Sequence, residues 1–324
     1  MTGIYLDGWA HVHMPELESF FTPWHGVLYS GYAMSVGVIL VWTWTRTGTG
    51  KHRWRKAIPE GHALSLLGAV IFLIGGSGDL LWHEIFGIEI GVEALLSPTH
   101  LVLAIGAVLI VSGGARHFWA THVEERRMNL LDSLPLILSL AFTLAGIFFM
   151  TQFAEYTDPG FTRVKPGSLL IIQKIQALSV ESTLLFSIFL TGTLGVALRR
   201  GRLPLGSITV ILTLVVTGLA LMREGRELIP AAFFAGLIGD GLLHLTDRRQ
   251  TRRHLRLLSV LLPASYTLFS ILILKKTEGV WLSVHLWMGM IVMSGIAGFL
   301  VSLVAWPTPR RSEQTHATGS GAAI

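Results

Sequence analysis

Long apolar runs constrain this chain more than any other feature of its sequence. Hydrophobic residues make up 51% of it and charged residues only 14%, well below the quarter that is usual for soluble domains. Nine runs approach or exceed the length of about 20 residues with which a helix crosses a bilayer. They lie near 24–45, 62–82, 99–115, 133–152, 169–198, 205–222, 229–246, 257–274 and 281–306. We therefore predict an all-α, polytopic integral membrane helix bundle of about nine transmembrane helices.

Basic residues predict how the bundle is oriented. Lys and Arg cluster after the first, third, fifth, seventh and ninth runs, and the other connecting segments contain fewer of them. Because cytoplasmic loops carry such an excess, we expect the N-terminus outside and the C-terminus inside, in a prokaryotic plasma membrane. The expected organisation is one transmembrane domain over 1–306, with a repeated motif in 1–115, an additional bundle in 116–306 and a disordered cytoplasmic tail over 307–324.

The number and placement of the charged residues also indicate which partners to expect. The net charge of +5 is modest, and the basic residues sit in short segments beside apolar runs, which is typical of membrane orientation and not of nucleic-acid binding. We expect the lipid bilayer as a partner, with other membrane subunits or further copies of the chain as candidates, and no nucleic acid. The chain has no cysteine, so disulfides and thiolate metal sites are excluded.

A motif of one aspartate and two histidines occurs twice in the first third of the chain. Each copy reads Asp-x-x-x-His, a spacer, and then Ser or Thr-Pro-x-His at the start of an apolar run. The copies consist of Asp7, His11 and His25 and, beginning 72 residues later, of Asp79, His83 and His100. One carboxylate and two imidazoles are the usual ligands of a borderline ion such as copper, with zinc and iron as alternatives.

The second copy, the second triad below, predicts a point where two helix ends meet. Asp79 and His83 are four residues apart and share one face of a helix. Ser97 suits an N-cap and Pro98 the first helical position, which puts His100 in the first turn of the next helix. The three side chains can therefore converge at the outer membrane edge.

The first copy, the first triad, has the same order of residues. Thr22 is the expected cap, Pro23 the first helical residue, and His25 lies in the first turn. Asp7 and His11 precede it on a short segment that we expect to be a helix lying at the membrane interface. Both triads fall on one side of the membrane and could form a paired site. The alternative is that these Asp–His pairs only hydrogen-bond to orient helix ends.

Other polar residues inside the apolar runs suggest an interior site. A carboxylate at Glu181 is costly in lipid, so we expect it to face the bundle interior with Lys174, two turns away, as its partner. The functional interpretation is that Glu181 or Glu155 handles protons for the site. Polar residues at the outer ends of the runs, Gln152 and Arg223 among them, suit a cavity next to the triads.

A third Asp-x-x-x-His segment, Asp240 to His244, lies in the seventh run near the inner edge. Its downstream Pro-x-x-x segment ends in Tyr266 instead of histidine. We favour a structural pair, with Arg248 as a candidate partner, over a further metal site.

Residues 5–115 resemble the C subunit of the copper-dependent membrane monooxygenases, the particulate methane and ammonia monooxygenases. In that family an Asp-x-x-x-His segment precedes a Thr-Pro-x-His helix start, and a similar segment follows about seventy positions later. The resemblance implies that both triads are copper ligands near an oxygen-activating centre. The spacer from His83 to His100 is longer here than in the family pattern, the family's upstream spans are missing, and six further spans follow.

These observations predict a metal-binding membrane protein, with copper as the expected cofactor and a copper-dependent monooxygenase subunit as one possible enzyme. Two alternatives remain open: a non-catalytic protein that handles or transports copper or zinc, and a structural subunit of a membrane complex.

Overall fold

The computed structural model describes residues 1–14, 21–47, 54–89, 91–121, 129–152, 165, 167–223, 225–245, 251–277 and 279–307. Within these ranges all regular secondary structure is helical and no strand occurs. The prediction of an all-α chain is confirmed for this part of the protein. A helix satisfies its own backbone N–H and C=O groups, which lipid cannot do, so an apolar chain of this kind folds as helices.

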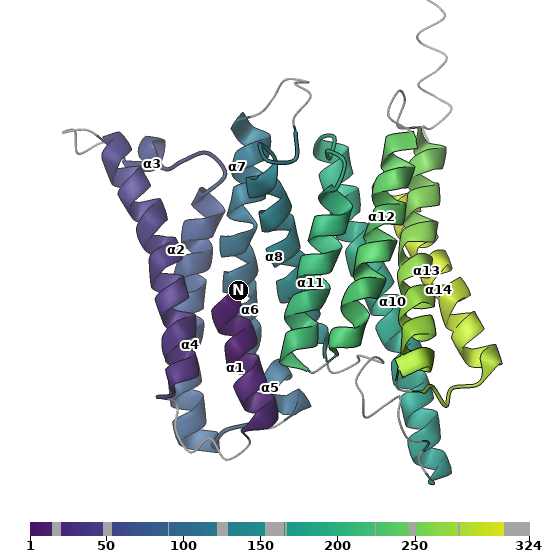
Figure 1. Cartoon of the computed structure of the whole chain (residues 1–324). Helices are drawn as coiled ribbons and strands as arrows, with labels where there is room; N and C mark the ends of the chain where they lie inside the picture. The colour runs from purple at the N-terminus through teal and green to yellow at the C-terminus, as the bar shows by residue number, and fades with distance from the viewer. Residues whose placement is uncertain are drawn as a thin grey trace, which may run out of the picture.

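The helices follow one another in the order shown in Figure 1. The first half of the chain contains α1 (Thr2–His13), α2 (Pro23–Thr47), α3 (Trp54–Ala57), α4 (Ala63–Phe86), α5 (Val92–Leu96), α6 (Pro98–Val111), α7 (Gly113–Thr121) and α8 (Leu134–Thr151). The second half contains α10 (Leu169–Arg200), α11 (Ser207–Met222), the 3-10 helix η2 (Arg226–Leu228), α12 (Ile229–Leu245), α13 (Arg252–Thr277) and α14 (Val284–Ala305).

Eight helical segments of the described chain are long and apolar enough to cross a membrane. They include α6 with α7 as one segment, Pro98–Thr121, and η2 with α12 as another, Arg226–Leu245. The sixth predicted span corresponds to α11, which is apolar but has only 16 residues, fewer than the roughly 20 that a full crossing takes. A ninth span therefore stays a prediction, as does the orientation.

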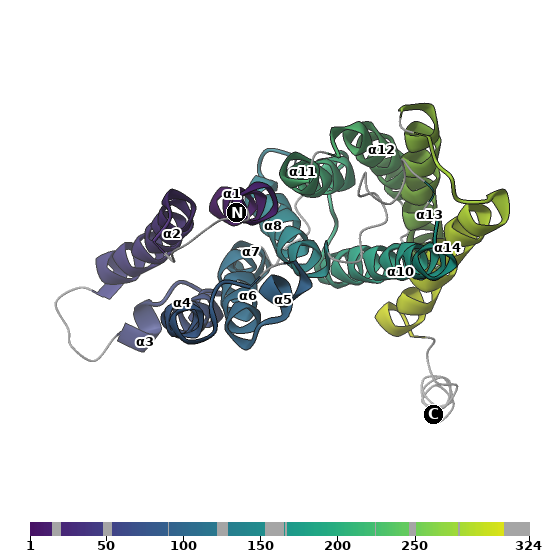
Figure 2. The same ribbon diagram turned by 90° about the horizontal axis from the view of Figure 1, so that it is seen from below.

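The helices form two groups that meet at α1 and α8. Figures 1 and 2 show α2, α4 and α6 on one side and α10 to α14 on the other. The main apolar core lies at α8 and in the second group, where Leu144, Ile211 and Leu262 are almost fully buried. In contrast, α2 exposes apolar side chains such as Met34 and Trp44, as a lipid-facing helix does.

Helix α1 stands beside the long helices instead of lying across their ends. Figure 1 shows its first residue at mid-height of the bundle and its last turn at the end where α2 begins. It packs against α2 and α11, and Gly8 lies so close to Phe149 that a Cβ on this glycine would be 2.6 Å from the ring. The prediction of a helix here is confirmed, and its place at the membrane interface stays a prediction. Small residues on α1 let it pack closely against its neighbours, and Gly8 and Ala10 are buried there.

Helices α4 and α6 pack backbone to backbone. A Cβ on Gly106 would lie 2.7 Å from the Phe72 nitrogen and 2.8 Å from the Gly68 carbonyl oxygen, so only glycine fits at this crossing. Small residues permit such close approach in membrane helices. The tight pair brings the last turns of α4 and the first turn of α6 together, and these turns carry the second triad.

Candidate metal centre

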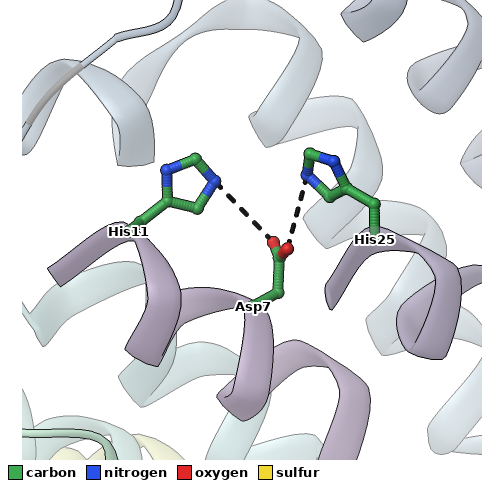
Figure 3. Close-up of side chains that lie close together, drawn as sticks. All are labelled: Asp7, His11 and His25. Atoms are coloured by element: carbon green, nitrogen blue, oxygen red, sulfur yellow. Dashed lines mark ion pairs between the residues drawn. The ribbon is translucent and has the colours of Figure 1, made fainter. Parts of the chain in front are cut away.

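The first triad joins two helices. Figure 3 shows His11 and His25 on either side of the Asp7 carboxylate, with Asp7 and His11 on α1 and His25 in the first turn of α2. The Nε2 atom of His25 is 3.4 Å from Asp7 Oδ1, and that of His11 is 4.0 Å from Oδ2. The hydroxyl of Thr22 accepts a hydrogen bond from the His25 backbone N–H at 3.2 Å, so Thr22 caps α2 as predicted.

The second triad repeats this arrangement at the junction of α4 and α6. Asp79 Oδ2 is 3.4 Å from His83 Nε2, and Asp79 Oδ1 is 3.3 Å from His100 Nε2. The Asp79 side chain is 2% exposed, whereas that of Asp7 is 18% exposed. All three predicted residues of each copy are therefore brought together, within 4.8 Å of one another at their donor atoms.

Further groups surround the second triad. Thr99 donates a hydrogen bond of 2.7 Å to Asp79 Oδ1. Ser97 occupies the N-cap position of α6, as predicted, but its hydroxyl makes no capping bond and lies 2.8 Å from His100 Nδ1 instead. On the outer side of His83, Nδ1 lies 3.3 Å from the Gly87 carbonyl oxygen and 3.2 Å from Glu89 Oε2. Each imidazole thus turns Nε2 toward Asp79 because its other nitrogen has a partner.

The spacing of the donor atoms fits a metal ion. Bonds of about 2.1 Å to nitrogen and oxygen ligands in a tetrahedral site put neighbouring ligand atoms about 3.4 Å apart. The Asp79–His83, Asp79–His100 and Asp7–His25 separations are 3.3 to 3.4 Å. These values exceed the 2.7–3.2 Å of an ordinary N–H···O bond. The residues present can therefore hold an ion between them with little movement.

Both triads line a single cavity of about 620 Å³. Five of the six triad residues, all except His83, form its wall, together with apolar side chains such as Phe72, Leu103 and Phe149. Gln152 and Arg223 also line it, and Arg223 donates a hydrogen bond of 2.8 Å to the Gln152 carbonyl oxygen. The predicted cavity beside the triads is present, and the two triads are neighbours across it.

The two triads also influence each other's charge. Burial raises the pKa of the Asp7 carboxyl, an effect that His25, His11 and, across the cavity, His100 oppose. Burial likewise lowers the pKa of His11, and Asp7 opposes that shift. The site therefore disfavours isolated charges of either sign, which a bound cation between Asp7 and its histidines would relieve.

Sequence reasoning missed two side chains of this cavity. Tyr29 follows His25 by four residues and so shares its helix face; a Cβ on Gly76 would lie 2.6 Å from the Tyr29 hydroxyl oxygen. Glu89, one of several acidic residues between the two halves of the second motif, also lines the wall. The four-residue spacing could have indicated Tyr29, but nothing in the sequence separates Glu89 from Glu84 or Glu93.

The expected interior position of Glu181 is wrong. Both Glu181 and Lys174 are exposed on α10, the cavity wall does not include Glu181, and no ion pair joins the two within the described chain. Helix α10 is also longer than a single crossing needs: its 32 residues span about 48 Å, against a bilayer core of about 30 Å. Figure 1 shows its first turns extending past the neighbouring helices. Glu155 lies outside the described residues, so its proposed role stays a prediction.

The third Asp-x-x-x-His segment has a structural role. Asp240 of α12 is 2% exposed and accepts hydrogen bonds from the backbone N–H groups of Ile208 and Thr209, at 3.1 and 2.9 Å, and from the Thr209 hydroxyl at 2.6 Å. It thereby caps the start of α11 from a neighbouring helix. His244 is exposed, and among the described residues only the two triads form a metal-ligand group. Arg248, the suggested partner, lies outside the described residues.

We compared the chain with protein-family models, with curated proteins and with solved structures, and found no match in any of the three.

Proposed function

We propose that this chain binds two transition-metal ions, one at each triad, within a membrane-embedded helix bundle. The observation that carries the proposal is that both triads line one cavity with donor atoms at ligand spacing. Asp240 provides an internal comparison, because it is a structural aspartate with hydrogen bonds of 2.6 to 3.1 Å. The triad aspartates hold their histidines at 3.3 to 4.0 Å instead, which leaves room for an ion.

Copper is the metal that we propose. Two imidazoles and one carboxylate suit copper, zinc and iron, and Cu²⁺ binds such nitrogen and oxygen sites most tightly among the divalent ions of this series. The resemblance of residues 5–115 to the C subunit of the copper membrane monooxygenases favours the same metal. Bound copper would supply redox chemistry, including the activation of dioxygen.

The residues of the cavity suggest the class of substrate. Phe72, Leu103 and Phe149 give it apolar walls, which exclude water and suit a small apolar or weakly polar molecule. Tyr29, whose ring centroid is 6.4 Å from that of His25, adds a hydroxyl to the wall near the first triad. We therefore propose an oxidoreductase subunit that holds a small substrate between the two triads.

The triads face the extracytoplasmic side in this proposal. His25 is in the first turn of α2, and Arg46 is in its last turn at the opposite end. Arg199 and Arg200 likewise end α10, far from its triad-side start (Figure 1). Positive residues mark the cytoplasmic ends of membrane helices, so the other ends, with the triads, lie outside.

The test is elemental analysis of the protein purified in lipid nanodiscs. The wild type should carry two copper ions per chain. The variant His83→Ala should lose one and His11→Ala should lose the other, because each removes one of three ligands. A matched control is His13→Ala, two positions from His11 on the same helix. The His13 imidazole bonds the Trp9 carbonyl oxygen at 2.9 Å and belongs to neither triad, so this variant should keep both ions.

The outcomes separate the candidate functions. Copper together with copper-dependent oxygen consumption supports the oxidoreductase. Copper or zinc without oxygen consumption in any substrate mixture favours metal handling. Absence of metal from the wild type after copper loading contradicts the proposal and leaves the triads as helix-orienting contacts.

A further inference from the structure

The two triads differ in what surrounds them, and the difference bears on how each holds its ion. We infer that the second triad is a high-affinity, retained metal site and that the first triad is a weaker, exchangeable one, with Thr99 and Ser97 as the positioning residues that set the difference. This inference rests on the proposed function, since it assigns unequal roles to its two metal sites.

The hydroxyl before the proline is used differently in the two copies. Thr22 and Ser97 occupy the same motif position, three residues before the second histidine. Thr22 accepts a bond from the His25 backbone N–H and so stabilises the start of α2. Ser97 bonds the His100 imidazole at Nδ1 instead, which leaves Nε2 as the metal-facing nitrogen. A partner on the far nitrogen fixes the tautomer and ring orientation of a ligating histidine.

The residue after the proline differs as well. In the second triad it is Thr99, whose hydroxyl donates to the Asp79 carboxylate at 2.7 Å. In the first triad the same position is Trp24, whose indole ring meets Trp9 edge to face at 6.0 Å between centroids. Within the described chain, Asp7 has its two histidines as ion partners and no hydroxyl donor like Thr99. The Asp79 carboxylate is therefore oriented before an ion arrives, and the Asp7 carboxylate is not held in this way.

The charge and the burial of the second triad also favour tighter metal binding there. Glu89 adds a second carboxylate beside the second triad, 3.2 Å from His83 Nδ1, and its side chain is only 12% exposed. A carboxylate behind a ligating histidine raises the basicity of that ligand, and the added negative charge favours a divalent cation. In the second triad His83 and Asp79 are 4% and 2% exposed and His100 is 19% exposed. In the first triad His11, Asp7 and His25 are 21%, 18% and 11% exposed, so the first triad is the more exposed of the two as a whole.

The expected difference in affinity is large enough to measure. Removing one hydrogen-bonding group behind a metal ligand lowers metal affinity by about 10- to 100-fold in metalloproteins. The second triad has at least two such groups, Ser97 and Thr99. We therefore expect its ion to be held at least tenfold more tightly than the ion of the first triad, and to remain when a chelator removes the first.

Single-site variants separate the two ions. The variant His11→Ala keeps only the second triad intact, and His83→Ala keeps only the first. Each variant is loaded with copper and mixed with a chromogenic copper chelator, and the release of copper is followed by absorbance. The expected result is that His11→Ala releases copper at least tenfold more slowly, and that the wild type releases it in two phases. Equal release from both variants, or slower release from His83→Ala, would overturn the inference while leaving the proposed function intact.

A second comparison tests the positioning residues themselves. In the His11→Ala background, Thr99→Val and Ser97→Ala should each accelerate copper release by about 10- to 100-fold and alter the copper electron paramagnetic resonance signal, which a purely structural role would not change. The matched control is Thr22→Val, at the motif position equivalent to Ser97, which should leave release unchanged in that background. Unchanged release in both Thr99→Val and Ser97→Ala would refute their role. If no variant and no wild-type sample binds copper at all, the proposed function itself fails.

Discussion

Replacing Gly106 by alanine should separate the two helices that carry the second triad. The added carbon would lie 2.7 Å from the Phe72 nitrogen, which is 0.7 Å short of ordinary contact at 3.4 Å. The atoms that it meets belong to the α4 backbone and cannot rotate away, so α4 and α6 must move apart. Overpacking of this kind costs about 1–3 kcal/mol, and the better helix propensity of alanine offsets about 1 kcal/mol of it.

The matched control is Gly192→Ala in the middle of α10, where an added Cβ meets no atom within 4 Å. Both variants gain the same helix propensity, so the difference between them isolates the packing cost. We expect Gly106→Ala to be less stable than Gly192→Ala by about 1–3 kcal/mol. Unfolding in mixed micelles with increasing SDS, followed by circular dichroism, measures this difference.

The same variant should also weaken the second metal site. Gly106 lies six residues from His100 on α6, about 9 Å along the helix, so a shift at the crossing is transmitted to the 3.3 Å contact between His100 and Asp79. Copper release from the second triad should accelerate in Gly106→Ala and stay unchanged in Gly192→Ala. Equal stability and equal copper release in the two variants would refute the view that this glycine contact sets the geometry of the triad.

Three further predictions concern other parts of the chain. Asp240→Ala should lower the unfolding free energy in mixed micelles by about 2–3 kcal/mol, because buried donors at the start of α11 lose their acceptor; the copper content should not change. Burial, His117 and Arg116 lower the pKa of His62 from 6.5 to about 4, so the folded state resists its protonation and thermal stability should fall as pH drops from 6.5 toward 4. This fall should be smaller in His62→Gln. Ser139→Ala should lower the thermal midpoint, because its hydroxyl accepts from the Ala115 N–H at 2.9 Å and donates to a carbonyl where α6 gives way to α7.

The ligand set of the site could be predicted because its spacing is local. Asp79 and His83 share a helix face at a four-residue interval, and a proline marks the helix start that carries His100, so the convergence of the second triad follows from helix geometry. Most of the membrane spans could be predicted for the same reason, because each corresponds to one continuous apolar run. The distance between the two triads could not be predicted, because it depends on how α1 inserts against α2 and α11.

Two other predictions differ from the structure, one of them entirely and the other only in the bond that the side chain makes. Glu181 was expected inside because a carboxylate in lipid is costly, but it is exposed on α10. Ser97 is the N-cap residue of α6, as the preference for serine at this position predicts, but its hydroxyl bonds the His100 imidazole and not a backbone N–H. The Ser97 contact is local, three residues along the chain, but a propensity for the N-cap position does not say which group the hydroxyl bonds.

The position of α1 sets the order in which the site can be assembled during synthesis. Asp7 and His11 leave the ribosome before the other ligands, yet α1 packs on α11, where Gly218 leaves room for the Tyr5 ring. The part of this surface that α11 provides does not exist until α11 has been inserted, some 200 residues later, whereas α4 and α6 complete the second triad much earlier. Under the proposed two-site function, a nascent chain arrested before Ser207 should therefore hold the ion of the first triad less tightly than the released chain does. The first ligands to be translated would then be the last to be fixed in place.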